Sequence, residues 1–328
     1  DPGGTIAYML RPDGQPASIT APGSVVTSFA YDDYGRKTSI ADPSAGTQTF
    51  TESYSGNQKT TTVTDANGKT VSTVYDQYGR ATNVNRTEFN TTYAYNADGQ
   101  LASEASTNGT NKTYSYDSFG RVTNDVENCG VNLQHAYSYS DGNLSSKTTT
   151  VNSGNTATEN YSYTNGYLTE IKLNGQTSIW KLTEENELGQ PTKSQTGQLA
   201  RTYEYTQYGM PTRRTAGAIQ DFSYNFEVQT GNLLSRTDNK RTLMENFQYD
   251  NLNRLSVVGG NNIVYAVNGN ITQLPGTGMM TYDNSAKPYQ VTMLTPTGTA
   301  VPIRNQNVTY TSFQRPAQIT EGTRVAEF

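Results

Sequence analysis

One pair of residues in the sequence has the types needed for nucleophilic catalysis. Cys129 is the single cysteine and His135 is the single histidine, and Cys129 lies six residues upstream. A thiol becomes a nucleophile when a neighbouring base takes its proton, and a third group commonly orients that base. The sequence marks no third group near this pair, and the pair occurs once. We therefore interpret His135 as a strand or turn residue and Cys129 as a small buried side chain, and we predict that the chain is not an enzyme.

Metal ligands are equally sparse in this sequence. Zinc sites normally use three or four ligands, most of them cysteine or histidine, and the chain contains two such residues in all. The segment Asp65-Ala-Asn-Gly68 resembles the start of a calcium loop, but such a loop needs glutamate at its twelfth position, where this chain has Asp76. We therefore interpret 65–68 as a turn, and we expect no metal and no other cofactor.

Aspartate and a basic residue recur together along the chain. Five aspartates are followed four residues later by arginine or lysine, in the pairs Asp32 and Arg36, Asp76 and Arg80, Asp117 and Arg121, Asp250 and Arg254, and Asp283 and Lys287. Such a row could form a polar binding surface, but an active site would not recur in every unit. We interpret the pair as structural, with the aspartate accepting hydrogen bonds from turn backbone and the arginine bridging to a neighbouring hairpin.

Tyrosine and asparagine offer a second chemistry, which is the recognition of sugars. The chain has 24 tyrosines in 328 residues, and many asparagines accompany them. Sugar rings stack on aromatic side chains, and amide groups can hydrogen-bond to sugar hydroxyls. An extracellular carbohydrate-binding or adhesion module therefore stays open as an alternative function. Acceptor sequences for N-glycans, such as Asn90-Thr-Thr, follow from the composition and carry little weight.

The elements that must position these residues repeat every 20 to 24 residues. The sequence Tyr-Asp-x-x-Gly-Arg occurs in full at 31–36, 75–80 and 116–121, with weaker copies elsewhere. The spacing is regular over 8–255 and irregular over 256–328, where Tyr310 opens a loose copy at 310–316. The residues of the repeat signature are Tyr31, Asp32, Gly35, Arg36, Tyr75, Asp76, Gly79, Arg80, Tyr95, Gly99, Tyr116, Asp117, Gly120, Arg121, Tyr139, Gly142, Tyr163, Gly166, Tyr205, Gly209, Tyr249, Asp250 and Arg254.

Each repeat predicts two strands and two turns. Aromatic residues two positions apart, as in Tyr114-Ser-Tyr116 and Tyr203-Glu-Tyr205, alternate with polar residues, which is typical of a strand with unlike faces. Aspartate or asparagine followed by glycine then predicts a tight reversal, because glycine adopts the positive φ that the turn requires. Two strands of about seven residues and two turns of about four residues account for the period. We expect strands almost throughout and at most one or two helical turns, at 181–188.

The composition excludes several classes of protein. Only 33% of the residues are apolar, although ordinary domains contain roughly 45–50% when glycine is counted. Disordered chains are poor in aromatic residues, whereas 10% of this chain is aromatic and only 16% is charged. One curled sheet suits this composition, because ladder hydrogen bonds and aromatic cross-strand pairs, worth roughly 0.2–1 kcal/mol each, can replace a solid core.

Charge and hydropathy narrow the range of partners. The net charge of -5 and the scattered basic residues argue against a nucleic-acid interface. No apolar run reaches the roughly 18 residues that a membrane-spanning helix needs. The N-terminus, Asp1-Pro-Gly-Gly4, shows no export signal. We therefore expect neither nucleic acid nor a membrane span.

The Tyr-Asp-x-x-Gly-Arg signature resembles that of the RHS (rearrangement hotspot) or YD-repeat family, over essentially the whole chain. Members of this family are large secreted or surface proteins, among them bacterial polymorphic toxins, the C component of insecticidal toxin complexes, and animal teneurins. The resemblance implies a continuous β-sheet that spirals into a hollow shell. In the toxin members this shell encloses a cytotoxic C-terminal domain, which a self-cleaving core region releases. We find no clear counterpart of that core region here.

We therefore predict the all-β fold class, with tandem β-hairpin repeats that form a curled or spiral sheet, as in an incomplete YD-repeat shell. We interpret 1–328 as a single array of about 14–15 repeats that is truncated at its C-terminus. The resemblance implies a non-catalytic scaffold of a secreted or surface bacterial protein, which encapsulates or presents a C-terminal effector domain. The implied partners are that effector and, beyond it, surface glycans or a delivery apparatus.

Overall fold

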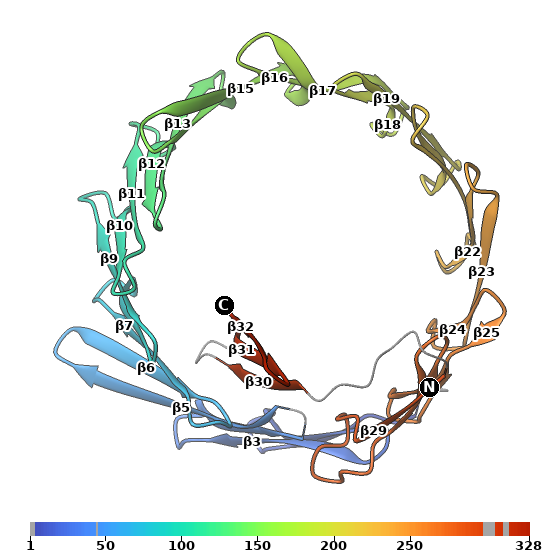
Figure 1. Cartoon of the computed structure of the whole chain (residues 1–328). Helices are drawn as coiled ribbons and strands as arrows, with labels where there is room; N and C mark the ends of the chain where they lie inside the picture. The colour runs from blue at the N-terminus through green and yellow to red at the C-terminus, as the bar shows by residue number, and fades with distance from the viewer. Residues whose placement is uncertain (1–3, 44, 298–305, 311–314) are drawn as a thin grey trace. The chain divides into compact units, whose positions relative to one another are not determined.

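The computed structural model describes residues 4–43, 45–297, 306–310 and 315–328. In these residues it contains β-strands and turns and no helix, and therefore no helix that could cross a membrane. Strands β1 to β25 belong to one 25-stranded sheet, and smaller sheets contain β26 to β29 and β30 to β32 (Figure 1). The predicted all-β fold of tandem hairpins is confirmed. The loose copy at 310–316 lies partly outside the described residues.

The chain divides into two compact units. Unit 1 comprises Asp1–Tyr93, Ser106–Asn108 and Asn261–Phe328, and unit 2 comprises Ala94–Ala105 and Gly109–Gly260.

The first strands of unit 1 are β1 (Ala7–Leu10), β2 (Pro16–Ala21), β3 (Val25–Tyr31), β4 (Lys37–Asp42), β5 (Gly46–Ser55), β6 (Gln58–Thr64), β7 (Thr70–Tyr75), β8 (Ala81–Arg86) and most of β9 (Asn90–Tyr95). Its later strands are β25 (Asn261–Asn262), β26 (Val264–Tyr265), β27 (Ile271–Leu274), β28 (Gly278–Thr281), β29 (Met293–Pro296), β30 (Gln306–Tyr310), β31 (Pro316–Glu321) and β32 (Arg324–Glu327).

The strands of unit 2 begin with β10 (Leu101–Ser106), β11 (Asn111–Tyr116), β12 (Val122–Asn128), β13 (Asn132–Ser140), β14 (Asn143–Val151), β15 (Asn155–Thr164), β16 (Tyr167–Leu173) and β17 (Thr177–Glu185). They continue with β18 (Pro191–Thr196), β19 (Leu199–Tyr205), β20 (Pro211–Ala216), β21 (Gln220–Phe226), β22 (Leu233–Asp238), β23 (Leu243–Tyr249) and β24 (Leu255–Val258).

A β-bulge lies at the repeat tyrosine of most hairpins. In β3 and β4, Ala30 pairs with Ser39 but Tyr31 pairs with Lys37, so that Thr38 is an extra residue in the second strand. The same register shift occurs at the tyrosines of six further hairpins, which are Tyr75, Tyr116, Tyr139, Tyr163, Tyr205 and Tyr249. A bulge bends its strand and increases the local twist. The repeat therefore places a bend at the same point of each of these hairpins.

Threonine stabilises two of these bulges. A bulge removes one residue from the ladder and leaves nearby backbone groups in need of other partners. The hydroxyl of Thr82, the extra residue of the β7–β8 hairpin, donates a hydrogen bond of 3.2 Å to the carbonyl of Val74. Thr169 donates to the carbonyl of Ser162 in the same way, at 3.1 Å. The threonine side chain thus satisfies a carbonyl just before the repeat tyrosine.

The structure has very little core. Among the described residues only Val25 and Ala216 are buried apolar side chains, and no large side chain is fully buried. The accessible surface is 20877 Å², whereas a compact monomer of this mass exposes about 13,000 Å². Stability must therefore come mainly from ladder hydrogen bonds and from contacts between neighbouring side chains on each face.

Aromatic side chains share one face of the first strand in many hairpins. In β3 the alternate residues Val25, Phe29 and Tyr31 are more buried than the residues between them. In β21 the rings of Phe222, Tyr224 and Phe226 stack in sequence, with centroids 6.4 Å apart. Offset aromatic stacking adds to the area that such rings bury. The predicted period-2 alternation is confirmed in these strands.

Candidate functional site

The aspartate of the repeat signature organises its own turn. Oδ1 of Asp32 accepts hydrogen bonds from the backbone N–H groups of Tyr34 at 3.0 Å and Arg36 at 2.9 Å. Oδ2 of Asp32 accepts from Nε of Arg36 at 2.7 Å. The backbone closes the same loop, since the Asp32 N–H donates to the Arg36 carbonyl at 2.9 Å. Both oxygens of the carboxylate are therefore occupied within the turn.

The same arrangement recurs at three further aspartates. Nε of the arginine lies 2.8 Å from Asp76, 2.8 Å from Asp117 and 2.7 Å from Asp250. At Asp32 the backbone N–H of Arg36 is the main cause that lowers the pKa of the carboxyl. At the other three aspartates burial opposes the change, but the arginine hydrogen bonds outweigh it, and each pKa falls below its usual value. These carboxylates stay ionised and bound at neutral pH.

Two of the predicted signature glycines lie in shorter turns. Gly142 and Gly166 occupy two-residue loops, in which Asp141 and Asn165 also have positive φ, of 50° and 53°. Positive φ at both loop residues is typical of a type I′ turn, whose twist suits a hairpin. The repeats of Tyr139 and Tyr163 therefore lack the aspartate–arginine loop.

The structure also differs from the sequence interpretation at the fifth aspartate pair. Around 283–287 the turn is organised by Asn284, whose Oδ1 accepts from the N–H groups of Ala286 at 3.0 Å and Lys287 at 3.2 Å. Asp283 instead donates its N–H to the hydroxyl of Thr292 at 3.1 Å. Asp283 lies one residue too early to occupy the turn-organising position, and the predicted Asp283–Lys287 pair is wrong.

Asparagine and glutamine build the same turn without charge. Oδ1 of Asn96 accepts from the N–H of Asp98 at 3.1 Å and of Gln100 at 2.9 Å. Its Nδ2 donates to Oε1 of Gln100 at 2.9 Å, in the place of the aspartate–arginine contact. Asn186 and Gln190 repeat these bonds. The sequence analysis missed this pair, although Asn-x-x-Gly-Gln at 96–100 and 186–190 has the same spacing as the charged signature.

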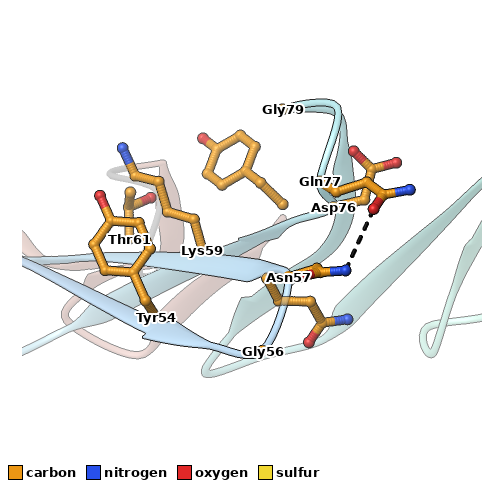
Figure 2. Close-up of a pocket in the computed structure, with 10 residues that line it drawn as sticks. Tyr54, Gly56, Asn57, Lys59, Thr61, Asp76, Gln77 and Gly79 are labelled. Carbon is orange, nitrogen blue, oxygen red and sulfur yellow. Dashed lines mark hydrogen bonds between the residues drawn. The ribbon is translucent and has the colours of Figure 1, made fainter.

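Side chains also connect successive turns. Nε2 of Gln100 donates to the carbonyl of Gly120 at 3.3 Å, and Nε2 of Gln190 donates to that of Gly209 at 3.0 Å. In unit 1, Nδ2 of Asn57 donates to Oε1 of Gln77 at 3.3 Å (Figure 2). Each of these bonds joins residues about one repeat apart. The turns therefore support one another along the sheet.

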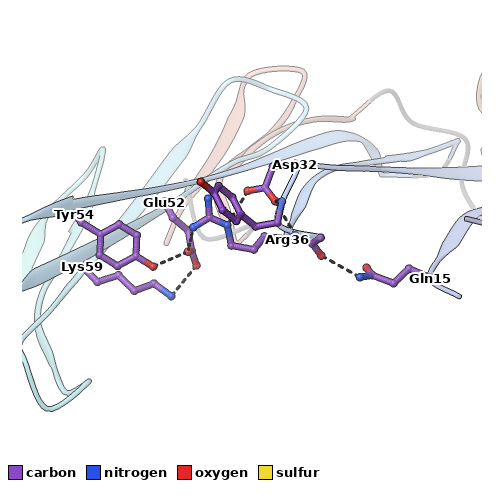
Figure 3. Close-up of polar contacts among 8 residues, drawn as sticks. Gln15, Asp32, Arg36, Glu52, Tyr54 and Lys59 are labelled. Carbon is purple, nitrogen blue, oxygen red and sulfur yellow. Dashed lines mark hydrogen bonds and ion pairs between the residues drawn. The ribbon is translucent and has the colours of Figure 1, made fainter. Parts of the chain in front are cut away.

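Arginine takes part in this support in two ways. Nη1 of Arg36 lies 3.0 Å from Oε2 of Glu52 on β5, in a network that continues through Lys59 (Figure 3). The guanidinium of Arg121 instead lies over the ring of Tyr139, 4.3 Å from its centroid. In both cases the arginine reaches the following hairpin, as the sequence interpretation requires.

The repeat tyrosine hydroxyl ties its strand to the preceding hairpin. Tyr31 donates to the carbonyl of Pro16 at 2.9 Å, and Tyr116 donates to that of Leu101 at 2.7 Å. Tyr139, Tyr205 and Tyr249 make the equivalent bonds at 2.8, 3.0 and 3.1 Å. In each case the acceptor is the first residue of the preceding second strand. This bond explains why these five positions hold tyrosine.

A buried carboxylate lies on the sheet face of unit 2. The side chain of Asp125 is only 7% exposed, and Nδ1 of His135 lies 3.0 Å from its Oδ2. The Tyr137 hydroxyl donates to Oδ1 at 2.7 Å. Burial raises the pKa of Asp125, but the hydrogen bonds from His135 and Tyr137 outweigh it and lower the pKa overall. Burial and the neighbouring carboxylate together raise the pKa of Tyr137.

This geometry corrects the prediction for the cysteine. Cys129 is exposed in the loop between β12 and β13, so the prediction that it is buried is wrong. A hairpin loop of a single sheet has no second layer to cover it. His135 lies in a strand and contacts Asp125, which faces it across the hairpin. The sequence contains a signal for the contact of Asp125 with His135. Both residues lie five positions from Gly130, so a hairpin that turns at this glycine brings them opposite each other. No group of three or more metal-ligating side chains gathers within the described part of the chain.

Turn tips carry exposed aromatic rings. Tyr34 is 85% exposed, Tyr78 is 73% exposed and Phe119 is 83% exposed. The arginine of each turn lies beside its ring, with its guanidinium carbon 4.9 to 5.3 Å from the centroid. The cation stabilises the ring position at little cost, since both groups stay in contact with solvent.

Two segments of the chain match a protein-family model described as RHS Repeat, at residues 12–47 and 95–126. These segments contain the loops of Gly35, Gly99 and Gly120. The resemblance indicated by the Tyr-Asp-x-x-Gly-Arg signature is confirmed. No curated protein sequence matches the chain.

Two solved structures have a similar fold. One is a Tc holotoxin pore of Photorhabdus luminescens with a mutated TccC3, at a TM-score of 0.69 and 12% identity over 97% of this chain and 19% of that chain. The other is a TcdB2-TccC3 crystal structure without the hypervariable C-terminal region, at a TM-score of 0.53 and 13% identity over 96% and 20% of the two chains. This chain thus spans about a fifth of the length of each relative.

Proposed function

We propose that this chain, which carries RHS repeats, is a non-catalytic scaffold within a longer bacterial protein. The chain would form part of a β-shell that encapsulates or presents a C-terminal effector domain. The whole protein would be secreted or displayed at the cell surface, where a delivery apparatus or surface glycans are further partners. The mechanism is containment, in which a wall of paired strands keeps the effector from water and proteases until release.

The observation that carries this proposal is where the repeated polar groups direct their hydrogen bonds. In Asp32 and its equivalents, both carboxylate oxygens accept hydrogen bonds from groups of their own turn. The tyrosine hydroxyls and glutamine amides bind the carbonyls of adjacent hairpins. Carboxylates, hydroxyls and amides that are hydrogen-bonded within the sheet are not available for chemistry on a substrate. The repeat chemistry therefore supports a scaffold and not an enzyme.

The solved relatives support the second part of the proposal. One of them lacks a hypervariable C-terminal region, which its TccC3 chain therefore has in the complete protein. By analogy, we place a variable effector after a single array that is regular over 8–255 and irregular over 256–328. The likeness at 12% and 13% identity concerns the fold. The effector itself is a proposal for this protein.

Protease protection tests the containment mechanism. The complete protein that the gene encodes is treated with a nonspecific protease, next to the segment after Phe328 expressed alone. We expect the C-terminal segment to survive much longer in the complete protein. Equal rates of cleavage, or a gene that encodes no domain after Phe328, would refute the proposal.

An adhesion or carbohydrate-binding module is the second candidate function. The exposed rings of Tyr34, Tyr78 and Phe119 favour it, since exposed aromatic rings at one edge of a sheet are available to stack on sugars. A glycan array tests this candidate, because an adhesion or carbohydrate-binding module must retain a glycan, whereas containment of an effector requires none.

A further inference from the structure

A pocket lies in unit 1 between the tip of the β5–β6 hairpin and the turn that follows β7. Its volume is about 580 Å³, and its lining includes Tyr54, Asn57, Lys59, Tyr75 and Gln77 (Figure 2). Small-molecule sites commonly have volumes of roughly 300–1,000 Å³. The pocket therefore has room for a ligand of one or a few rings.

The hairpin that forms one wall breaks the repeat pattern. Strands β5 and β6 pair without any register shift from Thr49 opposite Thr64 to Ser55 opposite Gln58. The hairpin therefore has no bulge, and it turns through Gly56 and Asn57 without an aspartate–arginine loop. In Figure 1 the two strands form a long hairpin. The repeat has thus changed its geometry next to this pocket.

The hydroxyl of Tyr75, which lines this pocket, is free. Equivalent tyrosines, such as Tyr31 and Tyr116, donate to the carbonyl of the first residue of the preceding second strand. Strands β5 and β6 pair without a bulge, and Tyr75 lies opposite Lys59 in an unbroken ladder. No described residue hydrogen-bonds to the Tyr75 hydroxyl. A partly buried hydroxyl without a partner is available to a ligand.

The charges around the pocket are already neutralised. Nζ of Lys59 lies 2.7 Å from Oε1 of Glu52, and Oδ2 of Asp76 lies 2.8 Å from Nε of Arg80. A charged ligand would have to compete with one of these ion pairs. The uncharged groups at the pocket include the phenol rings of Tyr54 and Tyr75 and the amides of Asn57 and Gln77. This set favours a neutral ligand.

We propose that this pocket is a binding site for a neutral pyranose sugar. A pyranose ring has an apolar face of C–H groups, which suits a tyrosine ring, and a polar edge of hydroxyls. Tyr54 is 66% exposed and offers its ring to the apolar face. The free hydroxyl of Tyr75 and the amides of Asn57 and Gln77 match the hydroxyls, since each can donate and accept hydrogen bonds. The inference rests on the second candidate function and is independent of the scaffold proposal.

The test combines a neutral glycan array with calorimetry on the chain 1–328. The best array ligand is titrated into the wild type and into the variants Tyr54→Ala and Tyr75→Phe. We expect the loss of the Tyr54 ring to weaken binding about tenfold and the loss of the Tyr75 hydroxyl to weaken it about fivefold.

The matched control is Tyr163→Phe. Tyr163 is also a repeat tyrosine whose hydroxyl has no hydrogen-bond partner among the described residues, but it lies in unit 2 and does not line the pocket. We expect this variant to bind as the wild type does, and thermal melts verify that all three variants are folded.

Two results would overturn the inference, and only one of them would also overturn the carbohydrate-binding candidate. An array without any retained neutral glycan removes both the pocket and the carbohydrate-binding candidate. A retained glycan whose affinity is the same in all three variants removes the pocket alone and leaves a carbohydrate-binding module with its site elsewhere.

Discussion

The hydroxyl of the repeat tyrosine acts as a clamp between neighbouring hairpins. A phenylalanine would bury the same ring at this position but could not bind the carbonyl at the start of the preceding strand. Tyr116 and Leu101 show this bond at 2.7 Å. Neutral hydrogen bonds of this kind contribute about 1 kcal/mol each to stability. In a protein with almost no buried core, a contribution of this size matters at each repeat that makes the bond.

We expect Tyr116→Phe to lower the local stability of β10 to β12 by about 1 kcal/mol, because the Leu101 carbonyl loses its partner. Native-state hydrogen exchange of the amides in these strands measures the change. Tyr163→Phe is the matched control and should leave exchange unchanged. Equal effects of the two substitutions would show that the ring, and not the hydroxyl, is responsible.

The hydrogen bonds of Asp221 predict how the stability of the fold depends on pH. Two hydrogen bonds from Arg213 and one from Asn239 lower the pKa of Asp221 to about 2. Because this folded value is below the unfolded value near 3.9, the carboxylate stabilises the fold above about pH 4. That contribution falls as the pH drops from about 4 towards 2.

Asp221→Asn should therefore be less stable than the wild type at pH 7, and the difference should shrink to near zero by pH 2. Urea denaturation across this range measures it. Asp33→Asn serves as the control, since Asp33 is exposed and has no described partner. A difference for Asp221→Asn that stays constant with pH would contradict the ionic origin.

At the scale of the hairpin, the bulge and the turn act together. The bulge bends the hairpin at the tyrosine, and the aspartate or asparagine fixes the loop that follows. Thr82 supplies a hydrogen bond to a carbonyl beside the bulge. The hairpin therefore carries its own bend without help from a second layer of structure.

We expect Thr82→Val to destabilise the β7–β8 hairpin by about 1 kcal/mol, because the Val74 carbonyl loses its hydroxyl partner while the side-chain volume is kept. Faster amide exchange within β7 and β8 measures the loss. Thr73→Val is the control, because Thr73 lies in the regular part of the same ladder. Similar exchange in the two variants would exclude a role for the bulge hydroxyl.

We predict that the aspartate–arginine pair of one turn can be replaced by the asparagine–glutamine pair of another. The double variant Asp117→Asn with Arg121→Gln should rebuild the contacts seen between Asn96 and Gln100. We expect it to melt within a few degrees of the wild type and above both single variants. Melting curves of the four proteins form a double-mutant cycle. A double variant that is no better than the worse single variant would contradict the equivalence of the turns.

Much of the hairpin could be predicted from the sequence because its signals are local. Alternating tyrosines predict the strands, and Asp-x-x-Gly-Arg predicts the loop, within a few consecutive residues. The bulge at Tyr31 was not predicted, because it depends on which residues pair across the ladder. The contact of Asp125 with His135 was missed for the same reason, since it depends on the register across the hairpin.

At the scale of the whole chain, stability is distributed along the sheet. Only Val25 and Ala216 are buried apolar residues in the described structure. In repeat proteins each element contacts mainly its neighbours, and stability is approximately a sum over these contacts. A local change should therefore have local consequences. The low apolar content predicted the lack of a solid core, whereas the division into two compact units gave no signal in the sequence.

We expect Phe222→Ala to speed amide exchange in β20 to β22, where its ring stacks on Tyr224, and to leave exchange in β4 to β7 unchanged. Exchange measured by mass spectrometry over the whole chain tests this. Tyr34→Ala, at an exposed turn tip, is the control for the loss of an aromatic ring. A uniform rise in exchange across all strands would instead indicate one cooperative folding unit.

The equivalence of the two turn chemistries has a consequence for how such a chain can evolve. Replacing aspartate and arginine with asparagine and glutamine alters the electrostatic character of a hairpin tip but keeps the backbone path. Mutations can therefore change the charge of one hairpin tip after another while the pairing of the strands is kept. The surface of the hairpin tips can in this way change while the architecture stays the same.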